Sequence, residues 1–241
     1  MEDVAPYVVS PLYFLQKYAY LQNKNTAQIV KWEAWAYLKD LLEILQTHHE
    51  IIIVKARQLG ISWLLAGYGL WKAQFSSAAK VLALSQGEDE AWDLLSKARF
   101  IWNREPEYMR LPIEHDARGW AQFSTGSEIK ALPSTDKAGR GTDATLVIRD
   151  ELAKHPYGAD NYTAISPAID SGGQLVDLST IDKIDPQNHF TERIQKALIG
   201  ANKKTLSSGL EVYTSKTGAL LVFAGWKLRP VREEGLSLDD W

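Results

Sequence analysis

The chain has 241 residues, of which 45% are apolar and 24% charged, so it can bury a large core and has the composition of an ordinary globular protein. It has no cysteine, which excludes disulfide bonds and thiolate metal sites. No apolar run approaches the roughly 20 residues that a membrane span needs, and the acidic N-terminus lacks a signal-peptide core. We therefore expect a soluble, cytoplasmic protein made of one domain with embellishments.

The net charge of −3 is unevenly distributed along the chain. Residues 193–232 carry eight Lys or Arg residues and one acidic residue, Glu211, whereas the rest of the chain has an acidic balance. A basic tract on an acidic body points to a polyanionic partner, although an ordinary solvated face explains it equally well.

Two helices are expected before the first strand, over residues 10–22 and 27–46, because apolar residues recur there at spacings of three and four. The four β-branched residues from Ile51 to Val54 then predict a buried strand. The sequence SWLLAGYGLWKA, which follows Ile61, predicts a helix that begins next to Gly60.

The segment from Ile51 to Ser62, IIIVKARQLGIS, has the layout of a phosphate-binding loop. An apolar strand, a short loop with one glycine and a helix with a serine in its first turn expose backbone N–H groups and the positive end of a helix dipole, and both attract an anion. The usual pattern G-x-x-x-x-G-K-[ST] is altered, because Lys55 replaces the first glycine and Ile61 replaces the lysine.

Further strands are predicted at 80–85, 145–149 and 174–179, with two more after Gly209. A helix is predicted to start in QGEDE, and the alternation around Thr125-Gly126 predicts a β-hairpin. Strands that alternate with helices of ten or more residues predict an α/β domain around a mainly parallel sheet.

Two carboxylates, Asp150 and Glu151, follow the apolar strand at 145–149. The carboxyl ends of strands in open α/β sheets line the ligand crevice. In nucleotide hydrolysis the first acid would hold Mg²⁺ through water, and the second would orient or deprotonate the attacking water. Acids often end strands, so the pair becomes informative only together with the phosphate-loop candidate upstream.

Three more residues lie where a nucleotide site could use them. Arg140 lies between two glycines just before the acid-tipped strand, so it could neutralise transition-state charge within its own subunit or in a neighbouring one, or could simply be held by nearby aspartates. Ser179 and Thr180 end another strand, where hydroxyl groups can sense a phosphate or the catalytic water but are also common strand caps.

Four segments in this order, KARQLGIS, LALSQGEDEAWDLLSKAR, GSEIKALPSTDKAGRGTDATLVIRDE and LSTIDKIDPQNHF, resemble the ATPase domain of the large terminase subunit. That subunit is the motor that packages DNA into capsids of tailed phages and herpesvirus-type viruses. The family's phosphate loop is often variant, with a basic residue at its start, then Arg-Gln-x-Gly and a hydroxyl residue. The resemblance covers residues 30–232 and implies an ASCE-type P-loop NTPase fold, with helices on both faces of the sheet.

The resemblance also implies roles for the loop residues. The nucleotide-binding segment would comprise Lys55, Ala56, Arg57, Gln58, Leu59, Gly60, Ile61 and Ser62. Lys55 would contact the β- and γ-phosphates in place of the missing loop lysine. Arg57 would be a phosphate contact or a sensor, with a structural salt bridge as the alternative. Gly60 would let the backbone approach the nucleotide, and Ser62 would be a Mg²⁺ ligand or, alternatively, a helix cap.

By the same resemblance, Asp150 would be the metal-side acid, Glu151 the catalytic carboxylate and Arg140 a finger that acts in trans. Ser179 and Thr180 would couple hydrolysis to movement. The family's adenine-contacting glutamine is not evident, because Leu38 occupies its place. The candidate substitutes are Gln28, Trp32, Trp35 and Tyr37, although aromatic residues at helical spacing are more often part of a core.

Three parts are expected on this basis: a helical subregion that contacts the nucleotide site (1–46), the P-loop ATPase core (47–232) and the start of a linker to an absent nuclease domain (233–241). The substrate would be ATP with Mg²⁺, and its hydrolysis would power translocation of double-stranded DNA into a procapsid. No nuclease activity is expected, because Asp239 and Asp240 do not make a two-metal site.

The implied partners are double-stranded DNA, the portal protein, the small terminase subunit and further copies of the chain in a ring, expected to hold five, without a membrane. The implied location is the cytoplasm of the infected host cell and, transiently, the procapsid. One alternative is another P-loop motor such as a helicase, whose further motifs are not found. The other is a nucleotide-binding scaffold without turnover, which would have no need of Glu151.

Overall fold

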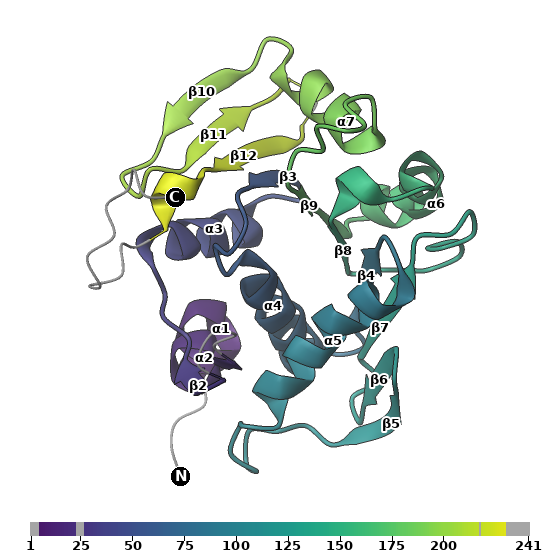
Figure 1. The fold of residues 1–241 in the computed structure, drawn as a ribbon. Coiled ribbons are helices and arrows are strands. Elements are labelled where there is room, and N and C mark those ends of the chain that lie inside the picture. Colours follow the sequence, from purple (N-terminus) through teal and green to yellow (C-terminus); the bar gives the residue numbers. More distant parts are fainter. Residues whose placement is uncertain (1–4, 23–26, 217, 230–241) are drawn as a thin grey trace.

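The structure is a computed structural model that describes residues 5–22, 27–216 and 218–229. Its described residues form a ten-stranded sheet in the order β10-β11-β12-β3-β9-β8-β4-β7-β6-β5 (Figure 1). The six central strands run parallel to one another. They are β12 (Leu220–Ala224), β3 (Glu50–Lys55), β9 (Gln174–Ser179), β8 (Leu146–Asp150), β4 (Lys80–Ser85) and β7 (Glu128–Pro133).

Antiparallel strands extend this parallel core at both edges. One edge carries β10 (Asn202–Thr205) and β11 (Glu211–Thr214), and the other carries β6 (Trp120–Phe123) and β5 (Ile113–Ala117). A separate two-stranded sheet joins β1 (Tyr20–Gln22) to β2 (Ile29–Lys31). The predicted mainly parallel α/β sheet is therefore confirmed, with its antiparallel strands confined to the edges.

Helices cover both faces of the sheet, because alternate residues of the buried strands point to opposite sides. Ile51 and Ile53 of β3 join the larger core, whereas Ile52 and Val54 join a smaller one on the other face. The larger core includes residues of α2 (Pro11–Tyr18), α3 (Ala36–Thr47), α4 (Ile61–Phe75) and α5 (Glu88–Trp102). The opposite face is covered by α6 (Gly158–Asp170) and α7 (His189–Leu198). The remaining short helices are α1 (Ala5–Val9), η1 (Leu152–Lys154) and η2 (Trp226–Leu228).

The strand order explains where a ligand site can form. Strand β9 lies between β3, which leads into the phosphate-loop candidate, and β8, which leads into the acid pair. The three strands are parallel, so their carboxyl ends reach the same edge of the sheet. Lys55, Asp150 and Ser179 are the last residues of these strands.

The two N-terminal helices were predicted too long. The first ends at Tyr18, and the second begins only at Ala36, because residues 20–22 and 29–31 pair as strands instead. Ile29 and Val30 are β-branched and favour extended backbone. The backbone N–H of Trp32 also donates to the carbonyl of Ala19 (3.0 Å), so Trp32 enters the core from a hairpin and not from a helix face.

The other predicted elements are confirmed: the strands at 80–85, 145–149 and 174–179, the hairpin around Gly126, the helix after QGEDE and the two strands after Gly209. The elements that had no counterpart among the predictions include α6, α7, β5 and β10. Residues 233–241, predicted to begin a linker, lie outside the described residues.

Candidate active site

The loop between β3 and α4 turns through two left-handed residues and leads directly into the first turn of the helix. The N–H of Ala56 donates to the carbonyl of Ala224 in β12 (2.8 Å), which fixes the start of the loop. Gln58 and Gly60 then adopt left-handed conformations, with φ of 63° and 72°, and α4 begins at Ile61. No described side chain caps this helix, so its first N–H groups and the positive end of its dipole face the loop.

Neighbouring elements hold the loop in place. Leu59 and Ile61 are buried in the larger core, and Leu38 packs beside Gly60. The hydroxyl of Tyr37 in α3 donates to the carbonyl of Leu59 (2.7 Å). On the other side Arg229 donates from Nη1 to Oε1 of Gln58 (2.8 Å). The loop is thus fixed from α3 and from the segment that follows β12.

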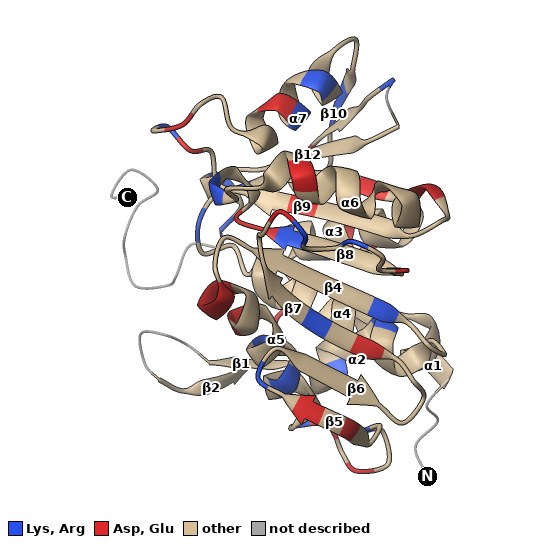
Figure 2. Cartoon of the chain, turned by 90° about the vertical axis from the view of Figure 1, so that its right-hand side faces the viewer, with Lys and Arg blue, Asp and Glu red and all other residues tan. Residues whose placement is uncertain are grey.

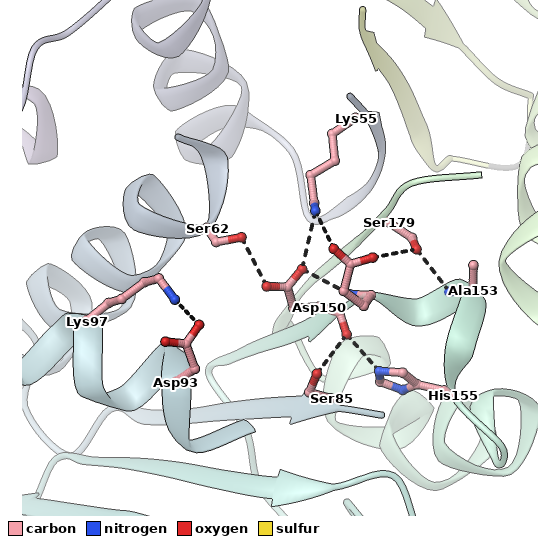
Figure 3. Close-up of polar contacts among 10 residues, drawn as sticks. Lys55, Ser62, Ser85, Asp93, Lys97, Asp150, Ala153, His155 and Ser179 are labelled. Atoms are coloured by element: carbon pink, nitrogen blue, oxygen red, sulfur yellow. Dashed lines mark hydrogen bonds and ion pairs between the residues drawn. The ribbon is translucent and has the colours of Figure 1, made fainter. Parts of the chain in front are cut away.

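A lysine, a serine and two carboxylates meet at the carboxyl ends of the strands (Figure 3). The Lys55 ammonium lies 2.7 Å from Oε1 of Glu151 and 3.8 Å from Oδ1 of Asp150. The Ser62 hydroxyl, in the first turn of α4, donates to Oδ2 of Asp150 (3.1 Å). Residues far apart in the sequence therefore form one polar cluster beside the loop.

Glu151 is held by the end of β9 as well. Its backbone is left-handed, with φ of 53°, and its N–H donates to Oδ1 of Asp150 (2.9 Å). Its second carboxylate oxygen accepts a hydrogen bond from the Ser179 hydroxyl (3.4 Å), and the backbone of Thr180 donates to the same carboxylate. Ser179 in turn accepts from the N–H of Ala153 (3.2 Å). The two predicted hydroxyl residues therefore do lie at Glu151.

The two acids have opposite pKa shifts. Burial raises the pKa of the Asp150 carboxyl, and the positive charge of Lys55 opposes this only in part. Burial also acts to raise the pKa of Glu151, but the hydrogen bond and charge of Lys55 outweigh it, so the pKa of Glu151 is lowered. Glu151 is therefore ionised at neutral pH, which a carboxylate that accepts a proton from water requires.

Two residues that the sequence analysis missed hold the backbone of Asp150. The Ser85 hydroxyl donates to its carbonyl (3.3 Å), and so does Nε2 of His155 (2.8 Å; Figure 3). Burial lowers the pKa of His155 to about 4, so the ring is neutral near pH 7 and this bond places its proton on Nε2. Ser85 ends β4, the neighbour of β8, so knowledge of the strand order would have indicated it; nothing in the sequence indicates His155.

The structure does not bring the two predicted arginines into this cluster. Arg57 and Arg140 are both exposed, and neither side chain forms a hydrogen bond or ion pair within the described parts of the chain. The structural salt bridge considered for Arg57 and the aspartate contact considered for Arg140 are thus not observed among the described residues.

The candidate contacts for an adenine base differ in their exposure. Trp32 and Tyr37 are buried in the larger core, as aromatic residues at this spacing usually are. Gln28 is exposed, and Trp35 is half-buried at the N-terminus of α3. Of the three aromatic candidates, Trp35 is the one that is not enclosed in the core.

The oxygen atoms of the cluster suit a magnesium ion. Mg²⁺ prefers oxygen ligands and is usually held by one or two carboxylates together with water and substrate phosphates. Ser62 and Asp150 supply a hydroxyl and a carboxylate whose oxygens lie 3.1 Å apart, beside the phosphate-loop candidate. The described residues contain no group of three or more His, Asp or Glu side chains that could hold a metal by themselves.

Beneath the acid pair lies a buried ionic cluster made of Arg149, Asp177, Arg193 and Glu50. Arg149 donates from Nε and Nη2 to both carboxylate oxygens of Asp177 (2.6 and 2.7 Å), and both side chains have no exposed area. Arg193 of α7 lies 2.6 Å from Asp177 and 2.7 Å from Glu50. The cluster joins β8, β9, β3 and α7 to one another.

The mainly parallel sheet with helices on both faces is the fold of a P-loop NTPase. No protein-family model matches the sequence. The chain has the fold of the ATPase domain of phage large terminases. It is similar to a point mutant of the large terminase ATPase domain of Thermus phage P74-26, with a TM-score of 0.59 and 17% identity over 76% of this chain and 79% of that one.

Two longer terminases share the fold. The large terminase of bacteriophage HK97 matches with a TM-score of 0.61 and 16% identity, over 80% of this chain and 41% of that one. The large terminase of a thermophilic bacteriophage, in complex with ADP, matches with a TM-score of 0.55 and 11% identity, over 81% of this chain and 44% of that one. This chain therefore spans less than half of the length of these two terminases.

Within the described residues, no helix is long and apolar enough to cross a membrane.

Proposed function

We propose that the chain is the ATPase motor domain of a large terminase, which hydrolyses ATP to move double-stranded DNA into a viral procapsid. The observation that carries the proposal is the cluster of Lys55, Ser62, Asp150 and Glu151 beside a loop with anion-binding backbone geometry. The fold shared with phage large terminases, one of them in complex with ADP, supports the same function.

In this mechanism the loop from Lys55 to Ser62 binds the phosphates of ATP. Its backbone N–H groups and the N-terminus of α4 receive the phosphate oxygens. The Lys55 ammonium exchanges its ion pair with Glu151 for contacts to the β- and γ-phosphates, which are anionic as well. Arg57, which is exposed and has no described partner, is available as a further phosphate contact or as a sensor.

Glu151 orients the attacking water and accepts its proton. The exchange of Lys55 frees one carboxylate oxygen for this task, while Ser179 and Thr180 still hold the carboxylate and can transmit its movement along β9. Ser62 and Asp150 would hold Mg²⁺, which when bound supplies positive charge to the β- and γ-phosphates. The Arg140 guanidinium stabilises the negative charge of the transferred phosphate, either within its own subunit or in a neighbouring one.

The partners follow from the same proposal: double-stranded DNA, the portal protein, the small terminase subunit and other copies of the chain in a ring. Residues 1–46, whose α3 contacts the loop through Tyr37, form the subregion beside the nucleotide, and residues 47–232 form the core.

The basic tract 193–232 offers less free charge than its sequence suggests. Arg193 is buried in the ionic cluster, and Lys203 pairs with Glu211 (2.8 Å). Helix α7 carries both acidic and basic positions (Figure 2), and its Lys196 pairs with Glu192 (2.8 Å). Lys204, Lys216 and Lys227 are exposed and have no ion pair with a described residue, so these three are the best candidates for contacts to a DNA backbone. Such contacts would be independent of sequence and sensitive to salt.

A steady-state ATPase assay tests the proposal. We expect Glu151→Ala to lower turnover by roughly 100-fold or more, because a positioned base contributes that much, while ATP binding stays intact. Lys55→Ala should weaken both binding and turnover. The control is Glu107→Ala, which removes an exposed acid outside the cluster.

The outcomes separate the candidate functions. Turnover that Glu151→Ala leaves unchanged would contradict the catalytic assignment. A wild-type chain that binds ATP without turning it over would favour the nucleotide-binding scaffold. ATP-dependent separation of DNA strands would favour a helicase.

A further inference from the structure

The loop that carries Arg140 is fixed at both ends and free at its tip. The N–H of Ser134 donates to the carbonyl of Ser85 (2.8 Å) at one end, and the N–H of Thr145 donates to the carbonyl of Lys80 (2.8 Å) at the other. Arg140 lies between Gly139 and Gly141, whose φ angles of 87° and 66° are left-handed. Such backbone suits glycine and lets the arginine project from a tight turn.

One buried amide, that of Asn161 in α6, holds the first half of this loop. Its side chain has no exposed area. The Oδ1 atom accepts a hydrogen bond from the Ser134 hydroxyl (2.6 Å), and Nδ2 donates to the carbonyls of Thr135 and Ala138, the latter at 3.3 Å. The two carbonyls can only accept, so the amide must present its NH₂ group to them. Both donor hydrogens and the acceptor of Asn161 are therefore used on this one loop.

The base of the Arg140 loop packs against α6, whereas its tip does not. A Cβ atom at Gly139 would lie 2.5 Å from Cγ2 of Ile165 in α6, so the backbone lies directly on this helix. A Cβ atom at Gly141 would meet nothing within 4 Å, and the Arg140 side chain is exposed. The loop thus has a base held by Asn161 and Ile165 and an arginine that remains free to reach a phosphate.

The helix that carries Asn161 is tied to the strand of the acid pair. Arg149, the residue before Asp150, donates from Nη1 to the carbonyl of Gly158 at the start of α6 (2.8 Å). A continuous set of contacts therefore runs from the acid-bearing end of β8 through α6 to the arginine loop. A leucine at position 161 would fill similar space without the cost of burying an amide, so packing alone does not account for this residue.

We propose that Asn161 is a positioning residue that sets the place from which Arg140 reaches the phosphate. The inference rests on the proposed function, in which Arg140 supplies charge to the transferred phosphate. An arginine of this kind acts through its position, and a displacement of about 1 Å can cost roughly 100-fold in rate. The three hydrogen bonds of Asn161 hold the base of the loop in one arrangement. Only the tip, where Gly139 and Gly141 flank Arg140, can then change its conformation.

The test is a double-mutant cycle between Asn161 and Arg140, with turnover and the Kd for a fluorescent ATP analogue measured on each variant. Asn161→Leu should lower kcat by roughly 10- to 100-fold and change the Kd less than about twofold. In an Arg140→Ala background the same substitution should cause no further loss, because the arginine through which it acts is gone. Thr163→Ala is the matched control, since its exposed hydroxyl bonds only its own helix at Ala159.

Ser134→Ala provides a milder variant that removes one of the three bonds. It should cause a smaller loss of kcat than Asn161→Leu and, again, no further loss in the Arg140→Ala background. This variant replaces Asn161→Leu in the cycle if the latter does not fold. The role of Asn161 would be overturned if Asn161→Leu or Ser134→Ala lowered kcat as much in the Arg140→Ala background as in the wild type. It would also be overturned if both variants left kcat unchanged. If Arg140→Ala itself leaves kcat unchanged, the finger in the proposed function fails, and the role of Asn161 fails with it.

Discussion

The ammonium group of Lys55 contacts both acids of the candidate site. It lies 2.7 Å from Glu151 and 3.8 Å from Asp150, at the end of β3, where the phosphate loop begins. From this place a lysine can reach phosphates without occupying the usual position in the first turn of the helix. Ile61 takes that position and packs in the core with 2% of its surface exposed. The sequence indicated this exchange, because Lys55 and Ile61 occupy the altered positions of an otherwise intact pattern.

Other residues could not have been predicted in this way. The sequence shows Arg149 as one polar residue in an apolar strand, and nothing in TLVIRDE indicates that Asp177, on the neighbouring strand, neutralises it. His155 and Asn161 depend equally on contacts with chain segments distant in sequence. A side chain's role can be predicted when its motif is local, and it escapes prediction when tertiary packing supplies its partner.

Glu105 allows a prediction about pH and stability. Burial raises its pKa to about 8, although a hydrogen bond from Gln74 opposes the shift. The unfolded chain would titrate this carboxyl near 4.5, so between these values the folded protein binds more protons than the unfolded one. The contribution of Glu105 to stability therefore falls as pH rises from about 4.5 to about 8.

We expect Glu105→Gln to be more stable than the wild type at pH 9 by roughly 2–5 kcal/mol, and to lose most of this advantage at pH 5. The new amide could also donate to Oε1 of Gln74, which is buried and has no hydrogen-bond partner among the described residues. Urea denaturation at the two pH values measures the effect, with Glu107→Gln as an exposed control. An equal effect of Glu105→Gln at both pH values would contradict the assignment.

At the scale of elements, the ionic cluster under the site fixes β8, β9, β3 and α7 relative to one another. Burial acts to raise the pKa of Asp177, but the charges of Arg149 and Arg193 outweigh it, so its pKa is lowered and it stays ionised. The cluster contains two cations and two anions, because Glu50 pairs with Arg193. This balance of charge predicts how the stability losses of single substitutions in the cluster combine in a double variant.

Arg149→Met alone leaves one uncompensated buried anion, and Asp177→Leu alone leaves one uncompensated cation. Each should cost roughly 3–5 kcal/mol. The double variant retains the neutral pair of Arg193 and Glu50, so it should be more stable than either single variant. Chemical denaturation of the four proteins measures this coupling. A double variant as unstable as the sum of the two single losses would show that the charges are not coupled.

The elements also show where sequence patterns mislead. Apolar residues at three- and four-residue spacing predicted a helix over 27–46, but its first part forms β2. Short apolar runs do not separate strand from helix by spacing alone, and the pairing of Leu21 with Val30 decides the matter. The strands of the parallel core were predictable because each is a compact run of apolar residues between polar segments.

At the scale of the whole molecule, the parallel sheet could be inferred from alternating strands and helices, but the strand order could not. That order places β9 between β3 and β8, and so brings Ser179 to the carboxylate of Glu151. Long-range pairing of this kind depends on how whole layers pack, which no single segment encodes. The start of the loop, the acid pair and Ser179 thereby come together at one place in the structure.

The most direct test of the central claim is a crystal structure of the chain with Mg²⁺ and a non-hydrolysable ATP analogue. We predict that the Lys55 ammonium contacts phosphate oxygens and has moved away from Glu151, with Ser62 and Asp150 on the metal side. A structure in which the phosphates lie elsewhere, while Lys55 keeps its ion pair with Glu151, would contradict the account.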